Sequence, residues 1–234
     1  MIVLLVLVTM GIPGRVEAHD GHPVKGLFDW RWYHEATRDS TEWLTLSTHR
    51  HYGDTSYATV WGNTITNSIS AWNSTSSAVI LDEVTTPSDY HDVHIAISDG
   101  DGFEHWGDFW PTWGLVGIAY NLDISKNICL SAGDCTYYYY SLVIVDETQF
   151  FFWNDATDRK AALVHELGHA LTLTHEPNVD SQYDGDCGNT VPGSVMDYDC
   201  VADEANYNSP TDWDACGLNH AYYHETWGYA GCDS

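Results

Sequence analysis

Residues 161–175 read Ala-Ala-Leu-Val-His-Glu-Leu-Gly-His-Ala-Leu-Thr-Leu-Thr-His, and the spacing within this stretch organises the rest of the chain. Its apolar residues recur at the i, i+4, i+7 and i+8 positions of a helix that buries one side. Asn154 or Asp155 is placed to cap such a helix, and Asp158 adds negative charge near the positive end of its dipole. The pattern predicts a helix whose buried stripe consists of Leu163, Leu167, Ala170 and Leu171.

A helix over these residues brings two histidines together. His165 and His169 lie on one face, separated by roughly 6 Å along the axis, so both imidazoles can reach one cation. Glu166 points to the side, where a carboxylate can take a proton from water that a metal activates. His175 can join only if the chain turns sharply, because six more helical residues would carry it about 9 Å along and roughly 240° around the axis. A third ligand at His175 therefore predicts a bend near Thr172.

Chance and a purely structural role are the competing explanations for these histidines. From the composition, roughly 0.002 occurrences of the pattern with all three histidines are expected in a chain of this length. In a structural role, the imidazoles would only satisfy buried hydrogen bonds. The spacing of His165, His169 and His175 favours a metal site over both explanations.

The length and the first residues indicate how the chain is divided. A chain of 234 residues suits one large domain or two lobes that share a cleft. Residues 2–8 form an apolar run, and the segment ending at Ala18 resembles a secretory signal, although no Lys or Arg precedes the run. A membrane anchor would need about 20 apolar residues. We expect a signal peptide at 1–18, followed by an extended lead-in at 19–40.

The six cysteines include no Cys-x-x-Cys pair, which fits disulfides in a secreted protein better than a zinc ribbon. Buried free thiols are the alternative. Fifteen pairings are possible, and proximity along the chain favours three of them. These are Cys129 with Cys135, Cys187 with Cys200, and Cys216 with Cys232.

The chain is strongly acidic, with 34 acidic and 8 basic residues and a net charge of −26. This charge would repel nucleic acid and anionic lipid surfaces, so we expect neither as a partner. The acidic excess indicates a strongly hydrated surface, and cation binding is the sharper alternative.

Periodicity and turn residues predict the other elements. A helix is expected at 57–74, capped by Thr55 or Ser56, with alternating or apolar strands before and after it. A last helix starts at 209–212, with Pro210 near its first position, and runs to about residue 223. Helix and strands alternate as in an α/β fold, with strands expected at 43–48, 78–84, 92–98, 114–122 and 141–146.

Two acidic clusters are candidate calcium sites. Asp99-Gly100-Asp101-Gly102 resembles part of a calcium loop, and the second cluster follows the metal motif. Neither has the full ligand pattern of an EF-hand, and solvated Asp/Gly turns are the alternative. The second cluster consists of Asp180, Asp184, Asp186 and Asn189.

Two motifs together resemble a known family. His165-Glu166-x-x-His169-x5-His175 is followed by the segment 194–198, Ser-Val-Met-Asp-Tyr, in the order found in metzincin zinc metalloproteases. The resemblance extends over the order of strands and helices from about residue 41 to 223. The layout is similar to the small secreted matrixin-like branch, while the Ser-x-Met-x-Tyr turn and Glu176 resemble astacins.

The resemblance implies an α/β (α+β) fold. Its N-terminal lobe has a twisted mixed sheet with two helices, and the active-site helix lies at the floor of a cleft. A small irregular C-terminal lobe ends in a helix. The catalytic domain then spans 41–234, with an upper lobe at about 41–175 and a lower lobe at about 176–234.

The resemblance also implies roles for individual residues. His165, His169 and His175 bind catalytic zinc, and Glu166 is the general base. Met196 forms a hydrophobic floor beneath the metal, and Tyr198 stabilises the tetrahedral intermediate. Taken alone, the last two have ordinary explanations as a core filler and an amphipathic side chain.

One position departs from the family pattern, because Thr172 stands where the family has Gly. The family uses Gly because the bend needs a positive φ, at which a β-branched residue costs roughly 1–2 kcal/mol. The free energy of zinc binding, about 10–16 kcal/mol for whole structural sites, can offset such strain. The alternative is that Glu176 replaces His175 as the third ligand.

The motifs predict a secreted zinc endopeptidase in which metal-activated water attacks a peptide carbonyl and Glu166 transfers the proton. We expect a monomer acting on protein or peptide, with the substrate strand adding to the edge at 114–122. The alternative is a non-catalytic secreted zinc-containing binding module for peptide or carbohydrate, suggested by 11 Trp and 15 Tyr. Glu166 argues against it, because a structural zinc site needs no base.

Overall fold

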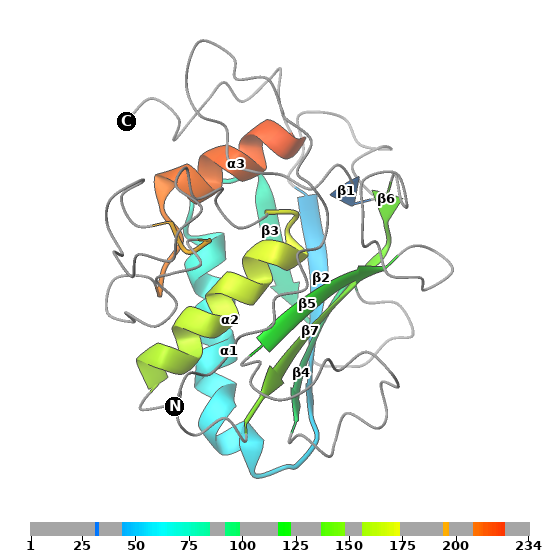
Figure 1. Ribbon diagram of the computed structural model, residues 1–234, viewed down its shortest axis with the longest axis vertical. Helices are drawn as coiled ribbons and strands as arrows, with labels where there is room; N and C mark the ends of the chain where they lie inside the picture. The colour runs from blue at the N-terminus through cyan, green and yellow to red at the C-terminus, as the bar shows by residue number, and fades with distance from the viewer. Residues whose placement is uncertain are drawn as a thin grey trace, which may run out of the picture.

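The structure, a computed structural model, describes residues 31–32, 44–84, 92–98, 117–122, 137–147, 156–173, 194–196 and 208–222. These residues form a mixed α/β fold with three helices, a five-stranded mixed sheet and a separate pair of two-residue strands (Figure 1). The helices are α1 (Tyr57–Asn73), α2 (Ala156–Ala170) and α3 (Asp212–Tyr222). The strands are β1 (Arg31–Trp32), β2 (Leu44–Tyr52), β3 (Val79–Glu83), β4 (Val93–Ser98), β5 (Gly117–Leu122), β6 (Tyr137–Tyr138) and β7 (Tyr140–Asp146).

The five-stranded sheet has the order β3-β2-β4-β7-β5. The first four strands are parallel, and β5 pairs antiparallel with β7 at one edge. The helix α1 connects β2 to its parallel neighbour β3, which is the usual crossover between parallel strands. The predicted strand at 114–122 is confirmed over Gly117–Leu122, and it lies at an edge of the sheet that the described residues form.

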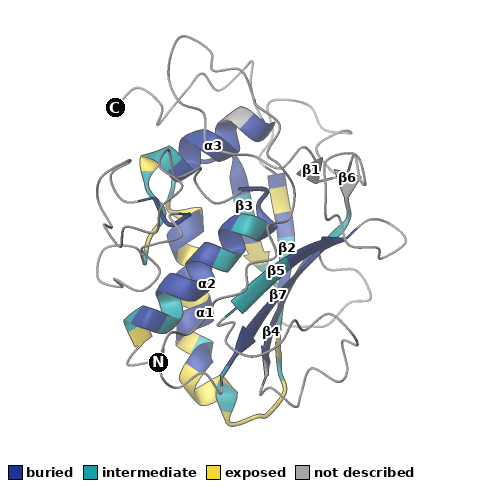
Figure 2. Cartoon of the chain, viewed as in Figure 1, coloured by how far each residue is buried: buried dark blue, intermediate teal, exposed yellow. Residues whose placement is uncertain are grey.

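The main core lies between the sheet and the helices α1 and α2, which pack against each other on one face (Figure 1). Successive strand residues point to opposite faces, so alternate residues of β4 and β7 reach this core. A second apolar cluster includes Ala96, Leu142 and Ile144, the intervening residues of the same strands. Burial on both faces explains why β7 contains a continuous apolar run. Figure 2 shows β4 and β7 as largely buried.

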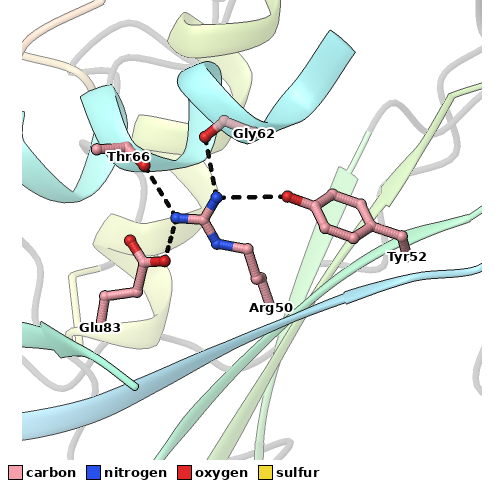
Figure 3. Close-up of polar contacts among 5 residues, drawn as sticks. All are labelled: Arg50, Tyr52, Gly62, Thr66 and Glu83. Atoms are coloured by element: carbon pink, nitrogen blue, oxygen red, sulfur yellow. Dashed lines mark hydrogen bonds and ion pairs between the residues drawn. The ribbon is translucent and has the colours of Figure 1, made fainter. Parts of the chain in front are cut away.

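A polar clamp joins α1 to the sheet at the end of β2 (Figure 3). The Arg50 guanidinium donates to the carbonyl of Gly62 at 3.0 Å and to the hydroxyl of Thr66 at 2.9 Å, both on α1. It also pairs with Glu83 on β3 and lies 3.4 Å from the Tyr52 hydroxyl. One cation thus satisfies acceptors on three consecutive elements, which fixes α1 above the strands that it connects.

Most predicted elements are confirmed, with corrections at their ends. β2 continues to Tyr52 rather than ending near residue 48, because its last residues pair with β4 although they lack an apolar period. Ser56 is the N-cap of α1, as predicted, but its side chain makes no capping bond. Instead, Asp54 accepts the Ser56 N–H at 2.7 Å. The start of α3 at Asp212 places Pro210 before the helix.

The pairing of β1 with β6 was not predicted, because residues 19–40 showed no clear period and a two-residue strand has none. Among the helices in the described ranges, none is long and apolar enough to cross a bilayer. The predicted leader, the caps Asn154 and Asp155, and both acidic clusters lie outside these ranges. Of the six cysteines, Cys216 lies inside the described ranges, buried on α3, so the three predicted pairings stay predictions. The predicted division into two lobes also stays a prediction.

Candidate active site

Helix α2 carries the two histidines on its buried side. Their ring centroids are 4.8 Å apart and the ring planes are nearly perpendicular, at 89°. The predicted stripe beside them is confirmed, because all four of its apolar residues are buried. Burial of the stripe against the sheet holds α2 in place, and helical spacing then puts both imidazoles on the same side. The stripe consists of Leu163, Leu167, Ala170 and Leu171.

Both imidazoles are oriented by backbone carbonyls. His165 Nδ1 lies 2.6 Å from the Val195 carbonyl oxygen, and His169 Nδ1 lies 2.8 Å from the Leu173 carbonyl oxygen. A carbonyl can only accept, so each Nδ1 carries a proton, and in a neutral ring the lone pair is then on Nε2. This is the tautomer in which histidine binds a metal, with its other nitrogen donating to an orienting acceptor. The two residues therefore fit zinc as nitrogen ligands.

The end of α2 confirms the predicted bend. The helix ends at Ala170, and Thr172 has a φ of 88°, the one positive value among the non-glycine residues that the structure describes. The N–H groups of Leu173 and Thr172 donate to the carbonyls of Gly168 and His169, each at 3.0 Å. These two bonds form a Schellman motif with Thr172 in its left-handed position. The turn also places the Leu173 carbonyl beside His169 Nδ1, so the strained turn orients this histidine.

Glu166 lies against the edge strand. Its carboxylate accepts a hydrogen bond from the Ala119 N–H on β5. A Cβ at Gly117 would lie 2.9 Å from the Glu166 Cγ, so Gly117 leaves the space that this side chain fills. Burial raises the pKa of Glu166 to about 8, while the bond from Ala119 acts in the opposite direction. A cation on the neighbouring imidazoles would lower this pKa.

Met196 packs directly beneath α2. A Cβ at Gly168 would collide with its Sδ and would lie 3.3 Å from its Cε and 3.2 Å from Trp72 Cζ2. Met196 is fully buried, and its predicted role as a floor beneath a metal stays a prediction. Trp72 also donates its indole N–H to the Val164 carbonyl at 3.0 Å, which ties α1 to α2. The close approach of these groups explains why the helix interior contains glycine, which costs about 1 kcal/mol relative to alanine.

The structure thus brings together four of the six predicted site residues. His175 and Tyr198 lie outside the described ranges, as does Glu176, the alternative ligand. Within the described ranges, no three His, Cys, Asp or Glu side chains form a group that could hold a metal ion. The four residues that it places are His165, Glu166, His169 and Met196.

The packing roles of Gly117 and Gly168 were not predicted from the sequence. A glycine inside a helical pattern is a usable signal, since it often marks a close packing contact. Asn121 was also not predicted to contribute. Its side-chain amide donates to the His169 carbonyl at 3.1 Å, and this bond joins the end of α2 to β5.

Comparison with known proteins adds little to this picture. No family model matches the sequence, and no match was found among curated proteins. One solved structure, titled "Structure of myroilysin", is 14% identical with a TM-score of 0.38, covering 78% of this chain and 96% of that chain. A second, "Crystal structure of myroilysin", is 13% identical with a TM-score of 0.40, covering 78% of this chain and 86% of that chain. At these values, neither similarity supports an assignment of function.

Proposed function

We propose that this protein is a zinc-dependent endopeptidase of the metzincin type. The observation that carries the proposal is the paired orientation of His165 and His169, which both donate Nδ1–H to backbone carbonyls. Histidines in a structural role would also satisfy buried hydrogen bonds, but two rings whose centroids lie 4.8 Å apart, with Glu166 between them in the sequence, favour a metal site. Glu166, next along the helix, adds the carboxylate that separates a catalytic site from a structural one.

We assign the third ligand to His175, because Thr172 turns the chain where the predicted site requires a bend. Zinc bound by the three histidines would supply a Lewis acid that polarises the peptide carbonyl and makes water more acidic. Glu166 takes the proton from the attacking water and passes it to the leaving amine. By family resemblance, Tyr198 donates to the developing oxyanion.

The edge strand β5 is the proposed position for the substrate. Gly117 and Ala119 lie beside Glu166, and among the strands in the described ranges β5 pairs with β7 alone. An extended peptide that pairs with the other side of β5 would run past the general base. Backbone hydrogen bonds then bind the substrate, and side-chain pockets would select its sequence.

Other properties are proposed on the sequence alone. The leader at 1–18 and the six cysteines support a secreted protein stabilised by disulfides. The net charge of −26 disfavours nucleic acid and anionic membranes as partners. We propose a monomer, with structural calcium at one of the acidic clusters as an additional cofactor.

Hydrolysis of casein and of a peptide library tests the proposed function. Activity should disappear with a zinc chelator and return when zinc is added back. Glu166→Gln is the matched control, because it should keep zinc content and fold while turnover is lost. Activity that survives chelation, or a variant within tenfold of the parent, would refute the mechanism. A zinc-loaded protein that cleaves no peptide would instead support the binding module.

A further inference from the structure

The segment Ser194–Met196, which lies beneath the two histidines, is anchored by a carboxylate of another element. All three residues are buried, and so is Asp214 in the first turn of α3. The Ser194 hydroxyl donates to Asp214 Oδ1 at 2.8 Å, and the Val195 N–H lies 3.4 Å from Asp214 Oδ2. One side chain of α3 therefore contacts this segment at two successive residues.

The same carboxylate starts α3. Asp214 Oδ2 accepts the Thr211 N–H at 2.7 Å and the Thr211 hydroxyl at 3.0 Å. The Ala215 N–H donates to the Thr211 carbonyl at 3.1 Å, so Thr211 is the N-cap, and Asp214 accepts the N-cap N–H as the third helical residue does in a capping box. A negative charge at this position is also favoured by the helix dipole. The helix start fixes the carboxylate, and the carboxylate fixes the buried segment.

The chain of contacts ends at a histidine. The Val195 carbonyl, which accepts from His165 Nδ1, belongs to the same peptide plane as the Met196 N–H. That N–H donates to the Ser194 hydroxyl oxygen at 3.1 Å, and the Ser194 hydroxyl donates to Asp214. The plane is thus held from its N–H side by a group that Asp214 orients.

We propose that Asp214 is a positioning residue for His165. Asp214 acts through Ser194 and the 195–196 peptide plane to set the tautomer of the His165 imidazole. This inference deepens the proposed function and rests on it for the identity of the metal. When an amide replaces the carboxylate, its NH2 group faces either the Ser194 hydroxyl or the Val195 N–H, so one of these two donors loses the acceptor that Asp214 supplies. The peptide plane can then rotate, and His165 loses the bond that keeps its lone pair on Nε2.

Two variants and one matched control test the inference. Asp214→Asn keeps the size of the side chain and removes one acceptor oxygen. Ser194→Ala removes the hydroxyl that links Asp214 to the Met196 N–H and leaves the contacts of Asp214 with Thr211 in place. The control is Asn219→Ala on the same helix. Asn219 is equally buried, and its amide holds Ala78 and Ser76 before β3 instead of the segment at 194–196.

Three quantities are measured on the full chain: the zinc dissociation constant by competition with a chromophoric chelator, the ¹⁵N shifts of His165 without metal, and the urea midpoint. Orienting partners of metal ligands are typically worth 10–100-fold in metal affinity. We expect Asp214→Asn and Ser194→Ala to weaken zinc binding by about tenfold or more and to shift His165 away from a single tautomer. Asn219→Ala should lower the urea midpoint and leave the zinc dissociation constant within about twofold of the parent.

The outcomes separate the two proposals. If Asp214→Asn and Ser194→Ala lower the urea midpoint while zinc affinity and the His165 shifts match the parent, the role of Asp214 is structural and the inference is overturned. If Asp214→Asn does not fold, Ser194→Ala decides alone. A parent protein without zinc affinity refutes the proposed function, and the tautomer of His165 in the metal-free variants still decides whether Asp214 positions it.

Discussion

Thr172 provides a sharp test of the turn that ends α2. Its φ of 88° lies in the left-handed region, which costs an ordinary L-residue roughly 1–2 kcal/mol and glycine almost nothing. Thr172 is also fully buried, so Thr172→Gly alone would mix relief of strain with loss of side-chain packing. Thr172→Ala removes most of the same packing and keeps the strain. The informative quantity is therefore the difference in stability between the two variants.

At this backbone conformation, the glycine variant should be the more stable. The strain of about 1–2 kcal/mol is partly offset by the larger unfolded-state entropy of glycine, about 0.4–1 kcal/mol, which leaves roughly 0.5–1 kcal/mol. For a chain of this size, that corresponds to about 1–4 °C in Tm. In a helix interior the order would reverse, with alanine more stable by about 1 kcal/mol. Thermal unfolding of both zinc-loaded variants measures the sign, and a more stable Thr172→Ala would refute the strained turn.

Three further predictions concern the packing and chemistry of the site. Gly168→Ala should destabilise the fold by about 1–3 kcal/mol in urea unfolding, because its Cβ collides with Met196. The double variant with Met196→Ala should lose less stability than the sum of the two single variants, and strict additivity would contradict the contact. Gly117→Ala should lower kcat while zinc affinity stays the same, because its Cβ displaces Glu166, and an unchanged kcat would place the general base elsewhere. Tyr198→Phe should reduce kcat by about 10²–10³-fold with a smaller effect on KM, and a parent-like kcat would remove Tyr198 from the chemistry.

Local periodicity explains why much of the site could be predicted. The relation between His165, Glu166 and His169 depends only on the helical repeat, which apolar spacing reveals within one segment. The bend at Thr172 followed from geometry, because a continued helix could not bring His175 back to the metal. Both features are confirmed by the end of α2 and by the φ of Thr172. The same reasoning located α1 and the apolar strands, whose patterns are equally local.

Contacts between distant segments could not be predicted in this way. Gly168 meets Met196, Gly117 meets Glu166, and Asp214 reaches a segment about 20 residues earlier. The helical or strand repeat of the sequence predicts none of these pairs. Each depends on how two elements pack, which involves the whole core. The pairing of β1 with β6 was missed for the same reason, since a two-residue strand is defined by its partner.

The sequence by itself predicts the class of chemistry proposed for this site, because two histidines and a glutamate at helical spacing are the pattern of a catalytic metal centre. The tertiary structure decided how those side chains are held. The Val195 and Leu173 carbonyls select the tautomers of His165 and His169, and both carbonyls come from segments outside the helix. Hydrogen-bond orientation requires a partner at a defined distance and angle, and only the folded chain supplies that partner.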